Sequence, residues 1–176
     1  MVIWLVGLSG AGKTSLGRSL TERLRARGRP VVMMDGDEMR RVFDMNNLDE
    51  DYTIAARRRM TVRYQHLSSW LEAQGIDVVC CVIGMFPEVL EENRAVFQSY
   101  FEVFLDAPLD VLQSRDPKGI YRRALEGALS DVVGVDIPYA SPAAPDLRIS
   151  VDGNIEAPDT LAGTVVTELL RRGIVA

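Results

Sequence analysis

The sequence has few residues of the kinds that bind structural metals or cross-link a fold. Its two cysteines, Cys80 and Cys81, are adjacent, and His66 is the single histidine among 176 residues. Neighbouring residues of a strand point to opposite faces, so the two thiols are poorly placed for a mutual disulfide. No cysteine or histidine spacing matches that of a zinc site. We therefore expect all three residues to be structural.

Long apolar runs and excess positive charge are also lacking. No apolar stretch approaches the roughly 18 residues that a membrane span needs. A strand-like run begins at residue 2, which leaves no room for a signal peptide. The net charge of −5 argues against a nucleic-acid partner, because proteins that bind phosphate backbones are usually basic. These features predict a cytoplasmic protein that binds neither membranes nor nucleic acids.

Apolar runs alternate with helical periodicity along the whole chain. Strand-like runs cover residues 2–7, 31–34, 77–83, 101–105 and 147–151, and helical patterns cover residues 13–26, 54–74, 87–97, 108–114, 119–127 and 160–172. Strands that are apolar on both faces and separated by helices indicate a parallel sheet covered on both sides. We predict a single α/β domain over residues 1–176 with a five-stranded parallel sheet, whose strands end at one shared edge.

The motif GLSGAGKT at residues 7–14 directly follows the first strand and opens the first helix. This is the pattern of a P-loop, in which glycines let backbone N–H groups face a phosphate and the helix N-terminus adds positive charge. We expect Lys13 to bridge the β- and γ-phosphates of ATP catalytically, and Thr14 to hold Mg²⁺. The predicted ATP-binding residues of this loop are Gly7, Ser9, Gly10, Ala11, Gly12, Lys13, Thr14 and Ser15.

A P-loop alone leaves several classes of protein open. A guanine-reading Asn-Lys-x-Asp motif is absent, and the chain is short for a motor or a helicase. A small-molecule kinase therefore fits best.

Asp35 and Asp37 follow the second predicted strand. An acid there could take a proton from an attacking hydroxyl or hold magnesium. It could equally form an Asp-Gly turn that caps the next helix, and the sequence leaves both interpretations open. The six arginines that follow favour an anionic substrate or a solvated helix face; they are Arg40, Arg41, Arg57, Arg58, Arg59 and Arg63.

Residues 115–119 read RDPKG and precede Tyr121, Arg122 and Arg123. A basic turn followed by a short basic helix is the composition expected of a lid that closes over phosphates and excludes water. We place this lid at about residues 115–142, with Arg115 and Lys118 among its cations.

These motifs together resemble the adenylylsulfate kinase family. The resemblance rests on GLSGAGKT, on DGD with Arg40 behind it, on EVFLDAPLDVLQSRDPKGIYRRA and on VVGVDIPYASP, in the family's order over residues 2–152. It implies a P-loop kinase fold with a short basic lid. It also implies Mg²⁺-dependent transfer of the ATP γ-phosphate to the ribose 3′-hydroxyl of a small nucleotide, by a homodimer.

Matching positions suggest individual roles. By resemblance, Asp35 is the acid near the 3′-hydroxyl and magnesium, and Asp37 supports it. Arg40 and Arg57 match arginines around the anionic group of the substrate, and Tyr52 matches an aromatic residue that stacks on the base. The lid residues by resemblance are Lys118, Tyr121, Arg122 and Arg123, and Arg115 is assigned to the ATP side.

Three departures from the family concern the acceptor. Met60 stands where the family has an asparagine, and Val132 where it has a lid aromatic. The segment Ile83-Gly84-Met85-Phe86-Pro87 stands where the family has Ile-Ser-Pro-aromatic-Arg, so the serine and the arginine are missing. The first four of these residues and Val132 are predicted to line a changed acceptor site. The segment CCVIGMFPEVLEENR resembles family members that phosphorylate cytidine 5′-diphosphoramidate.

Three alternatives stay open. The chain could be an ordinary adenylylsulfate kinase that makes 3′-phosphoadenylylsulfate, or a kinase of a non-nucleotide hydroxyl compound such as shikimate or a sugar acid. It could also be a non-catalytic nucleotide-binding regulator.

Overall fold

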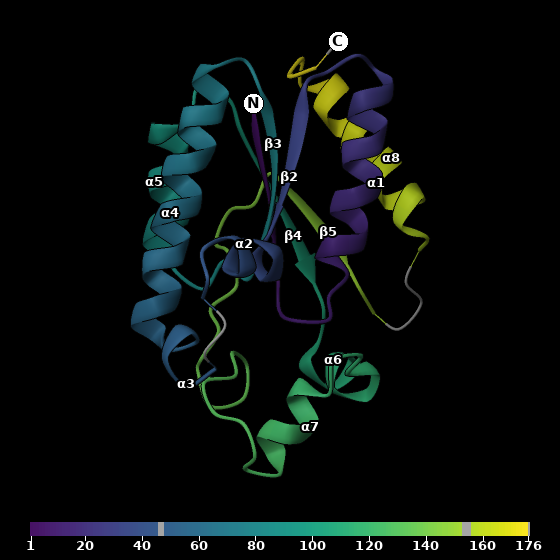
Figure 1. Cartoon of the computed structure of the whole chain (residues 1–176). Coiled ribbons are helices and arrows are strands. Elements are labelled where there is room, and N and C mark those ends of the chain that lie inside the picture. Colours follow the sequence, from purple (N-terminus) through teal and green to yellow (C-terminus); the bar gives the residue numbers. More distant parts are fainter. Residues whose placement is uncertain (46–47, 153–155, 176) are drawn as a thin grey trace.

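A five-stranded, wholly parallel sheet forms the centre of the protein (Figure 1). The structure is a computed structural model that describes residues 1–45, 48–152 and 156–175. The strands are β1 (Val2–Val6), β2 (Val31–Asp35), β3 (Asp77–Val82), β4 (Tyr100–Asp106) and β5 (Leu147–Ser150). Their order in the sheet is β2-β3-β1-β4-β5. The predicted fold class is confirmed, and the first strand of the chain lies in the middle.

Helices cover both faces of the sheet. On one face α1 (Lys13–Ala26) packs against α8 (Pro158–Arg171), and on the other α4 (Ile54–Ala73) packs against α5 (Pro87–Val96) (Figure 1). Four shorter helices lie near the carboxyl ends of the strands: α2 (Gly36–Val42), α3 (Leu48–Asp51), α6 (Leu109–Arg115) and α7 (Ile120–Leu125).

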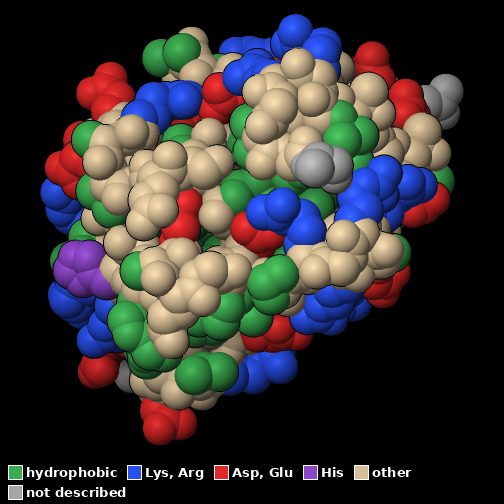
Figure 2. All heavy atoms as spheres, turned by 90° about the horizontal axis from the view of Figure 1, so that it is seen from above, with side chains coloured by type: hydrophobic (Ala, Val, Ile, Leu, Met, Phe, Trp, Pro, Cys, Tyr) green, Lys and Arg blue, Asp and Glu red, His purple; other side chains and the backbone are tan. Residues whose placement is uncertain are grey.

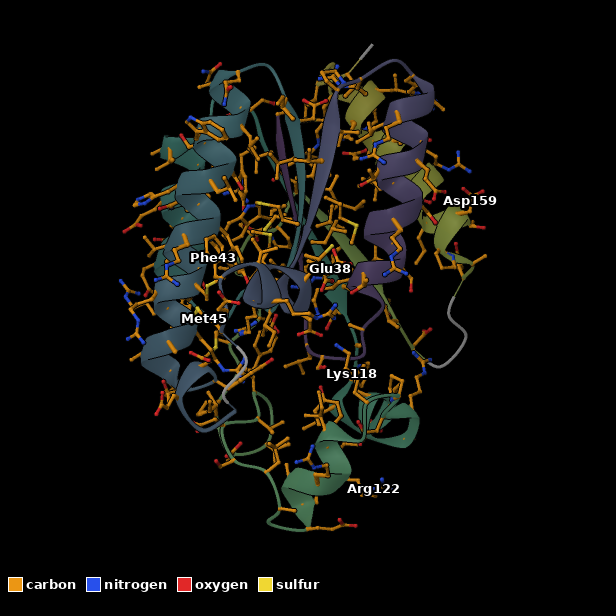
Figure 3. The ribbon with its side chains drawn as sticks, viewed as in Figure 1. Glu38, Phe43, Met45, Lys118, Arg122 and Asp159 are labelled. Atoms are coloured by element: carbon orange, nitrogen blue, oxygen red, sulfur yellow. The ribbon has the colours of Figure 1, made fainter. Side chains whose placement is uncertain are left out.

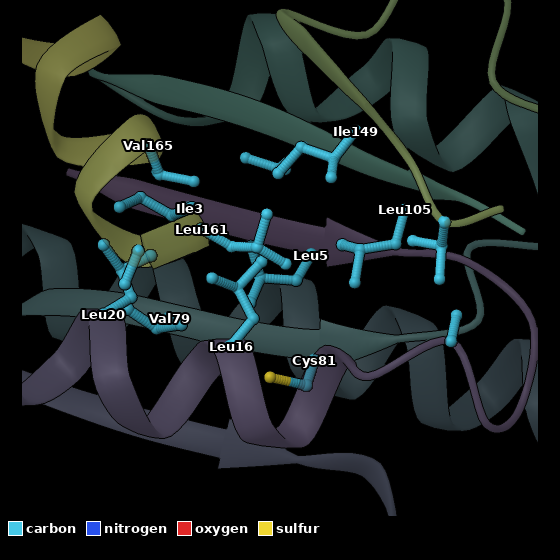
Figure 4. Close-up of a cluster of buried hydrophobic side chains, with 14 of the residues drawn as sticks. Ile3, Leu5, Leu16, Leu20, Val79, Cys81, Leu105, Ile149, Leu161 and Val165 are labelled. Carbon is cyan, nitrogen blue, oxygen red and sulfur yellow. The ribbon is translucent and has the colours of Figure 1, made fainter. Parts of the chain in front are cut away.

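Two apolar layers fill the space between the sheet and its helices. Beneath α1 and α8, Leu5 of the sheet belongs to one buried cluster with Leu16 and Leu161 (Figure 4). On the opposite face, Trp4 and Met60 belong to the second buried cluster. Between these two layers every residue of β1 is buried, which is the pattern expected of a parallel strand covered on both sides.

The cysteines lie where the alternation of strand side chains predicts. Cys80 belongs to the cluster beneath α4, whereas Cys81 belongs to the cluster beneath α1, and both are free thiols. His66 lies exposed on α4. Among the described residues, no group of three or more histidine, cysteine or acidic side chains could hold a metal ion.

The helices at residues 36–51 were not predicted. They are short, with seven residues in α2 and four in α3, and helices of this length show too few turns for apolar periodicity to reveal them. The closing helix α8 begins at Pro158, two residues before the predicted start, because a proline fits the first turn of a helix.

The carboxyl ends of the strands gather at one end of the molecule, together with the four short helices (Figure 1). The chain termini lie at the opposite end, where acidic and basic side chains are interspersed (Figure 2). In the described parts of the chain, no helix combines the length and the apolar character that crossing a bilayer requires. The parallel topology thus brings the predicted motifs to one edge of the sheet.

The loop after β3 imposes a steric constraint that predicts a large effect on stability. Gly84 has a φ of +72°, and a Cβ there would lie 2.8 Å from Cβ of Val6. We expect Gly84→Ala to lower the free energy of unfolding by about 3 kcal/mol, measured by urea titration, because overpacking adds to a left-handed backbone.

The matched control is Gly127→Ala. Gly127 has the same φ of +72°, but no atom lies within 4 Å of the added Cβ, so only the conformational cost of about 1 kcal/mol remains. Equal losses in the two variants would show that the contact with Val6 does not matter.

Candidate active site

The P-loop connects β1 to α1, as predicted. Gly12 caps α1 in the left-handed conformation, with a φ of 95°. The ammonium of Lys13 donates to the carbonyl oxygens of Gly7 and Leu8, at 2.8 and 2.7 Å. Burial lowers the pKa of Lys13 to about 8. The lysine is thus held inside the loop, where phosphate oxygens can replace the two carbonyls as its partners.

Asp35 joins the P-loop to the second predicted motif. Its Oδ2 accepts a hydrogen bond from the Thr14 hydroxyl at 2.6 Å, and its Oδ1 accepts one from the backbone N–H of Asp37 at 3.0 Å. Asp35 is the N-cap of α2 and is 8% exposed. Both interpretations of Asp35 from the sequence therefore fit one geometry, since the same carboxylate caps a helix and reaches the P-loop.

The oxygen atoms of Thr14 and Asp35 suit a magnesium ion. Mg²⁺ prefers hard oxygen ligands and usually takes few of them from the protein, because it keeps waters and binds substrate phosphates. Since the two oxygens are 2.6 Å apart, they could share one ion with a bound phosphate. The assignment of Thr14 and Asp35 as metal ligands stays a prediction.

The lid approaches the P-loop and α2. The hydroxyl of Tyr121 donates to the carbonyl of Ser9 in the P-loop at 2.9 Å. Lys118, on the side of the lid nearer α2 (Figure 3), forms an ion pair with Asp37. Burial alone would raise the pKa of Asp37, but the bond to Lys118 and the nearby Arg40 outweigh it and hold this pKa below its usual value.

Tyr52 lies in the part of the cavity predicted to hold the acceptor. The Arg40 guanidinium carbon lies 4.5 Å from the centre of the Tyr52 ring, and that of Arg57 lies 5.2 Å from it. Arg40 is buried, and its Nε has no hydrogen-bond partner among the described residues. Its Nη1 donates to the Gly36 carbonyl at 3.3 Å, so the Nε is the buried guanidinium nitrogen left without a partner in the described part of the protein.

Arg57 makes different contacts from Arg40. Its Nε donates to the Tyr52 carbonyl at 2.6 Å and its Nη2 to the Asp131 carbonyl at 2.7 Å. Burial, followed by the charge of Arg40, lowers the pKa of Arg57. Arg57 thus connects α4 to the Tyr52 segment and to the lid, a structural contact that the predicted anion-binding role did not include.

One cavity of about 800 Å³ contains most of the predicted residues, a volume within the usual range for small-molecule sites. The predicted residues that line it are Ser9, Gly10, Gly12, Lys13, Thr14, Ser15, Asp35, Asp37, Arg40, Tyr52, Arg57, Ile83, Gly84, Met85, Arg115, Lys118, Arg123 and Val132. Gly7 and Ala11 belong to the P-loop but do not line the cavity. Tyr121 does not line it either, and its side chain is buried.

Two further predicted residues do not belong to the cavity. Phe86 was predicted to bind substrate, but it is buried in the apolar cluster beneath α4, because the chain turns there into α5. Arg122 was predicted to act in the lid, but its side chain is exposed and points away from α2 (Figure 3). Arg122 and Arg123 are adjacent on α7, and adjacent residues of a helix do not face the same way. Arg123 therefore lines the cavity, whereas Arg122 does not.

The sequence interpretation missed several residues of the cavity. Thr61 and Tyr64 line it together with Arg57 and Met60, and their spacing along α4 follows one helix face. Because Arg57 was already assigned to the site, that spacing could have indicated that Thr61 and Tyr64 also face it. Asp131 also lines the cavity, and no motif indicated it.

Comparisons with known proteins place the chain among kinases of one family. The family model described as adenylylsulphate kinase matches residues 1–150. The chain is 35% identical over 149 residues to cytidine diphosphoramidate kinase of Campylobacter jejuni, covering 85% of each protein. It is 38% identical over 154 residues to adenylyl-sulfate kinase of Paraburkholderia xenovorans, covering 86% of this chain and 83% of that protein.

A longer relative and a solved structure extend the comparison. The chain is 38% identical over 175 residues to the bifunctional enzyme NodQ of Azospirillum brasilense, but it spans 27% of the length of that protein. The solved Mycobacterium tuberculosis APS kinase CysC, in complex with AMPPNP and APS, superimposes with a TM-score of 0.86 at 31% identity. That match covers 96% of both chains.

The pKa of Lys13 predicts a pH dependence of ATP binding. Below pH 8 the Lys13 ammonium is already charged in the free protein, so this group does not make the ATP Kd depend on pH. As the pH rises above 8, binding must restore the proton, and the ATP Kd should increase by up to about tenfold per pH unit. Titration calorimetry between pH 7 and 9.5 measures this. Lys13→Arg, which stays charged, should give a flat profile, and a flat wild-type profile would contradict the prediction.

The position of Asp35 predicts a loss of catalysis with little loss of ATP binding. Asp35→Asn keeps the side-chain shape but removes the base, so kcat should fall by at least about a hundredfold, while the ATP Kd changes by less than about threefold. Steady-state kinetics and calorimetry measure the two quantities. The control is Asp106→Asn, since Asp106 also ends a strand but pairs with Arg148 outside the cavity. An unchanged kcat in Asp35→Asn would refute the assigned role.

Proposed function

The chain belongs to the adenylylsulphate kinase family, and we propose that it transfers the γ-phosphate of ATP to the ribose 3′-hydroxyl of a small nucleotide. Its relatives are kinases with a hydroxyl acceptor, and the chain is a phosphotransferase of that class. The alternative of a non-catalytic regulator is set aside. The roles of single residues and the identity of the acceptor belong to the proposal.

The observation that carries the proposal is that one cavity is lined by the residues predicted for both halves of a phosphoryl-transfer site. Lys13 and Thr14 supply the donor half, and Arg40 and Tyr52 supply the acceptor half. Asp35 connects them through its 2.6 Å hydrogen bond to Thr14. Phosphoryl transfer depends mainly on positioning and on charge stabilisation, and this arrangement provides both.

On the donor side, the P-loop N–H groups and Lys13 would hold the β- and γ-phosphates. The lid adds Arg115, Lys118 and Arg123, which line the same cavity. The ion pair of Lys118 with Asp37 keeps this cation near the P-loop, where a phosphate can compete for it. Closure of these cations over the phosphates would exclude water and so suppress hydrolysis of ATP.

On the acceptor side, Asp35 would orient the 3′-hydroxyl and accept its proton as the bond to phosphorus forms. Thr14 and Asp35 would also hold Mg²⁺, whose charge stabilises the negative charge on the phosphate oxygens. Tyr52 offers a face on which a base can stack. Arg40, buried with an unpartnered Nε, would bind the anionic group of the acceptor.

We propose cytidine 5′-diphosphoramidate as the acceptor because the wall of the site is more apolar than the family pattern. Met60 is 1% exposed, and Val132 is 5% exposed. At Gly84 the left-handed backbone and the contact with Val6 exclude a side chain such as serine. A smaller pyrimidine base against an apolar wall suits these changes, and the Campylobacter jejuni relative carries the corresponding name.

Adenylylsulfate is the second candidate acceptor. Several relatives are named adenylyl-sulfate kinase, and the solved Mycobacterium tuberculosis protein is in complex with APS. Homodimer formation and a cytoplasmic location stay predictions.

Competing acceptors distinguish these candidates. With ATP and Mg²⁺, the kcat/KM for cytidine 5′-diphosphoramidate should exceed that for adenylylsulfate by at least about tenfold. Phosphorus NMR should show the new phosphate on the 3′-oxygen, and the 3′-deoxy analogue should give no product. Equal or better turnover of adenylylsulfate would overturn the acceptor, and phosphate at another position would overturn the 3′-kinase assignment.

A pair of variants tests the apolar wall in the same assay. Met60→Asn should shift the ratio of the two kcat/KM values toward adenylylsulfate by about fivefold or more, because it returns an amide to the wall. Met60→Leu keeps the wall apolar and should leave the ratio unchanged. If both variants shift the ratio equally, the packing of Met60 and not its missing amide determines the preference.

A further inference from the structure

We propose that Asp131 is a specificity-determining residue, whose carboxylate accepts a hydrogen bond from the exocyclic amino group of the acceptor's base. The inference rests on the proposed function, in which the acceptor is a nucleotide. It concerns a residue of the lid for which neither the sequence motifs nor the resemblance assigned a role.

The backbone at Asp131 is fixed from three sides. Its N–H and that of Val132 each donate to the Asp136 carboxylate at 2.6 Å, and its carbonyl accepts from Arg57 at 2.7 Å. Asp131 has a φ of +59°, in the left-handed region. A glycine would adopt this turn without a steric cost, so the turn itself does not require the Asp131 side chain.

The carboxylate of Asp131 is near the Arg57 guanidinium and interacts with its charge, but no hydrogen bond from the described residues holds it. It makes no hydrogen bond or ion pair with any residue in the described ranges, whereas both backbone polar groups of Asp131 are bonded. Asp131 is half-buried and lines the cavity. A strained aspartate that contributes no bond to the turn, at the wall of a ligand cavity, indicates a role toward the ligand.

The neighbours of Asp131 place it at the base end of the acceptor site. Arg57 donates hydrogen bonds to the carbonyls of both Tyr52 and Asp131, so these two residues lie next to the same guanidinium. Val132, the next residue, is buried and also lines the cavity. A base that stacks on Tyr52 would therefore have its edge within the reach of this part of the lid.

The chemistry of a carboxylate selects the base. An ionised carboxylate only accepts hydrogen bonds, and aspartate pairs with the N4 amino group of cytosine. Uracil presents a carbonyl oxygen at the same position, and hypoxanthine presents one where adenine has its amino group. The carboxylate and the carbonyl oxygen both accept hydrogen bonds and neither donates one, so this buried contact would be left unsatisfied. Asp131 thus favours an amino base over its oxo counterpart.

The experiment compares matched pairs of acceptors. Cytidine and uridine 5′-diphosphates form one pair, and adenosine and inosine 5′-phosphosulfates form the other. In the wild type, kcat/KM for the amino member should exceed that for the oxo member of at least one pair. Asp131→Asn and Asp131→Gly should reduce this ratio by about tenfold, and the pair that responds identifies the base.

Asp44→Gly is the matched control. Asp44 also has a positive φ, of 54°, but it is exposed and lies outside the cavity. Removal of this aspartate should leave the ratio unchanged. The ratio also separates base recognition from folding. If the Asp131 variants only damaged the structure, kcat/KM would fall equally for both members of a pair and the ratio would not change.

Two results are decisive against the inference. An amino-to-oxo ratio within about twofold of the wild type in both Asp131 variants would overturn it, as would a wild type without preference in either pair. If no nucleotide is phosphorylated, the 3′-kinase proposal fails, but calorimetric Kd values for the same pairs still test Asp131. Loss of the binding preference in the variants would then support the role of Asp131 separately from catalysis.

Discussion

The hydrogen bond from Thr14 to Asp35 is the interaction on which the site depends. It joins the P-loop, which follows the central strand β1, to the end of β2, an edge strand of the sheet. The parallel register makes this contact possible, because all strands end at the same edge. Helix α1 crosses from one to the other and presents Thr14 in its first turn. One carboxylate can therefore serve the P-loop and cap α2 at once.

Around this bond, protein groups hold the cations at the positions where phosphates are expected. Lys13 is bound by two carbonyls of its own loop, and Lys118 is bound by Asp37. When a phosphate oxygen replaces such a partner, the cation still has an oxygen atom to bind. That contact offsets the cost of holding the cation away from water. The Tyr121 hydroxyl donates to the Ser9 carbonyl and so connects the lid to the P-loop.

The acceptor half follows a different principle from the donor half. Its arginines and Tyr52 pack on one another, and Arg57 is occupied by backbone carbonyls. In our proposal, discrimination between acceptors depends on which polar groups the wall offers and which it withholds, since an unsatisfied buried donor or acceptor is costly. Apolar Met60 and Val132 would withhold hydrogen-bond partners from the base, while Asp131 would offer one.

The sequence by itself determined the five-stranded parallel sheet, the P-loop and the strand-end placement of Asp35, because continuous apolar runs and short motifs encode them locally. It did not decide that Phe86 packs into the core, that Arg122 points away from α2, or that Asp131 lines the cavity. Those facts depend on how short helices and loops are oriented by distant contacts, such as Arg57 to Asp131 across 74 positions of sequence. Local propensity cannot specify such pairs, since their geometry exists only once α4 and the lid have packed on the same sheet.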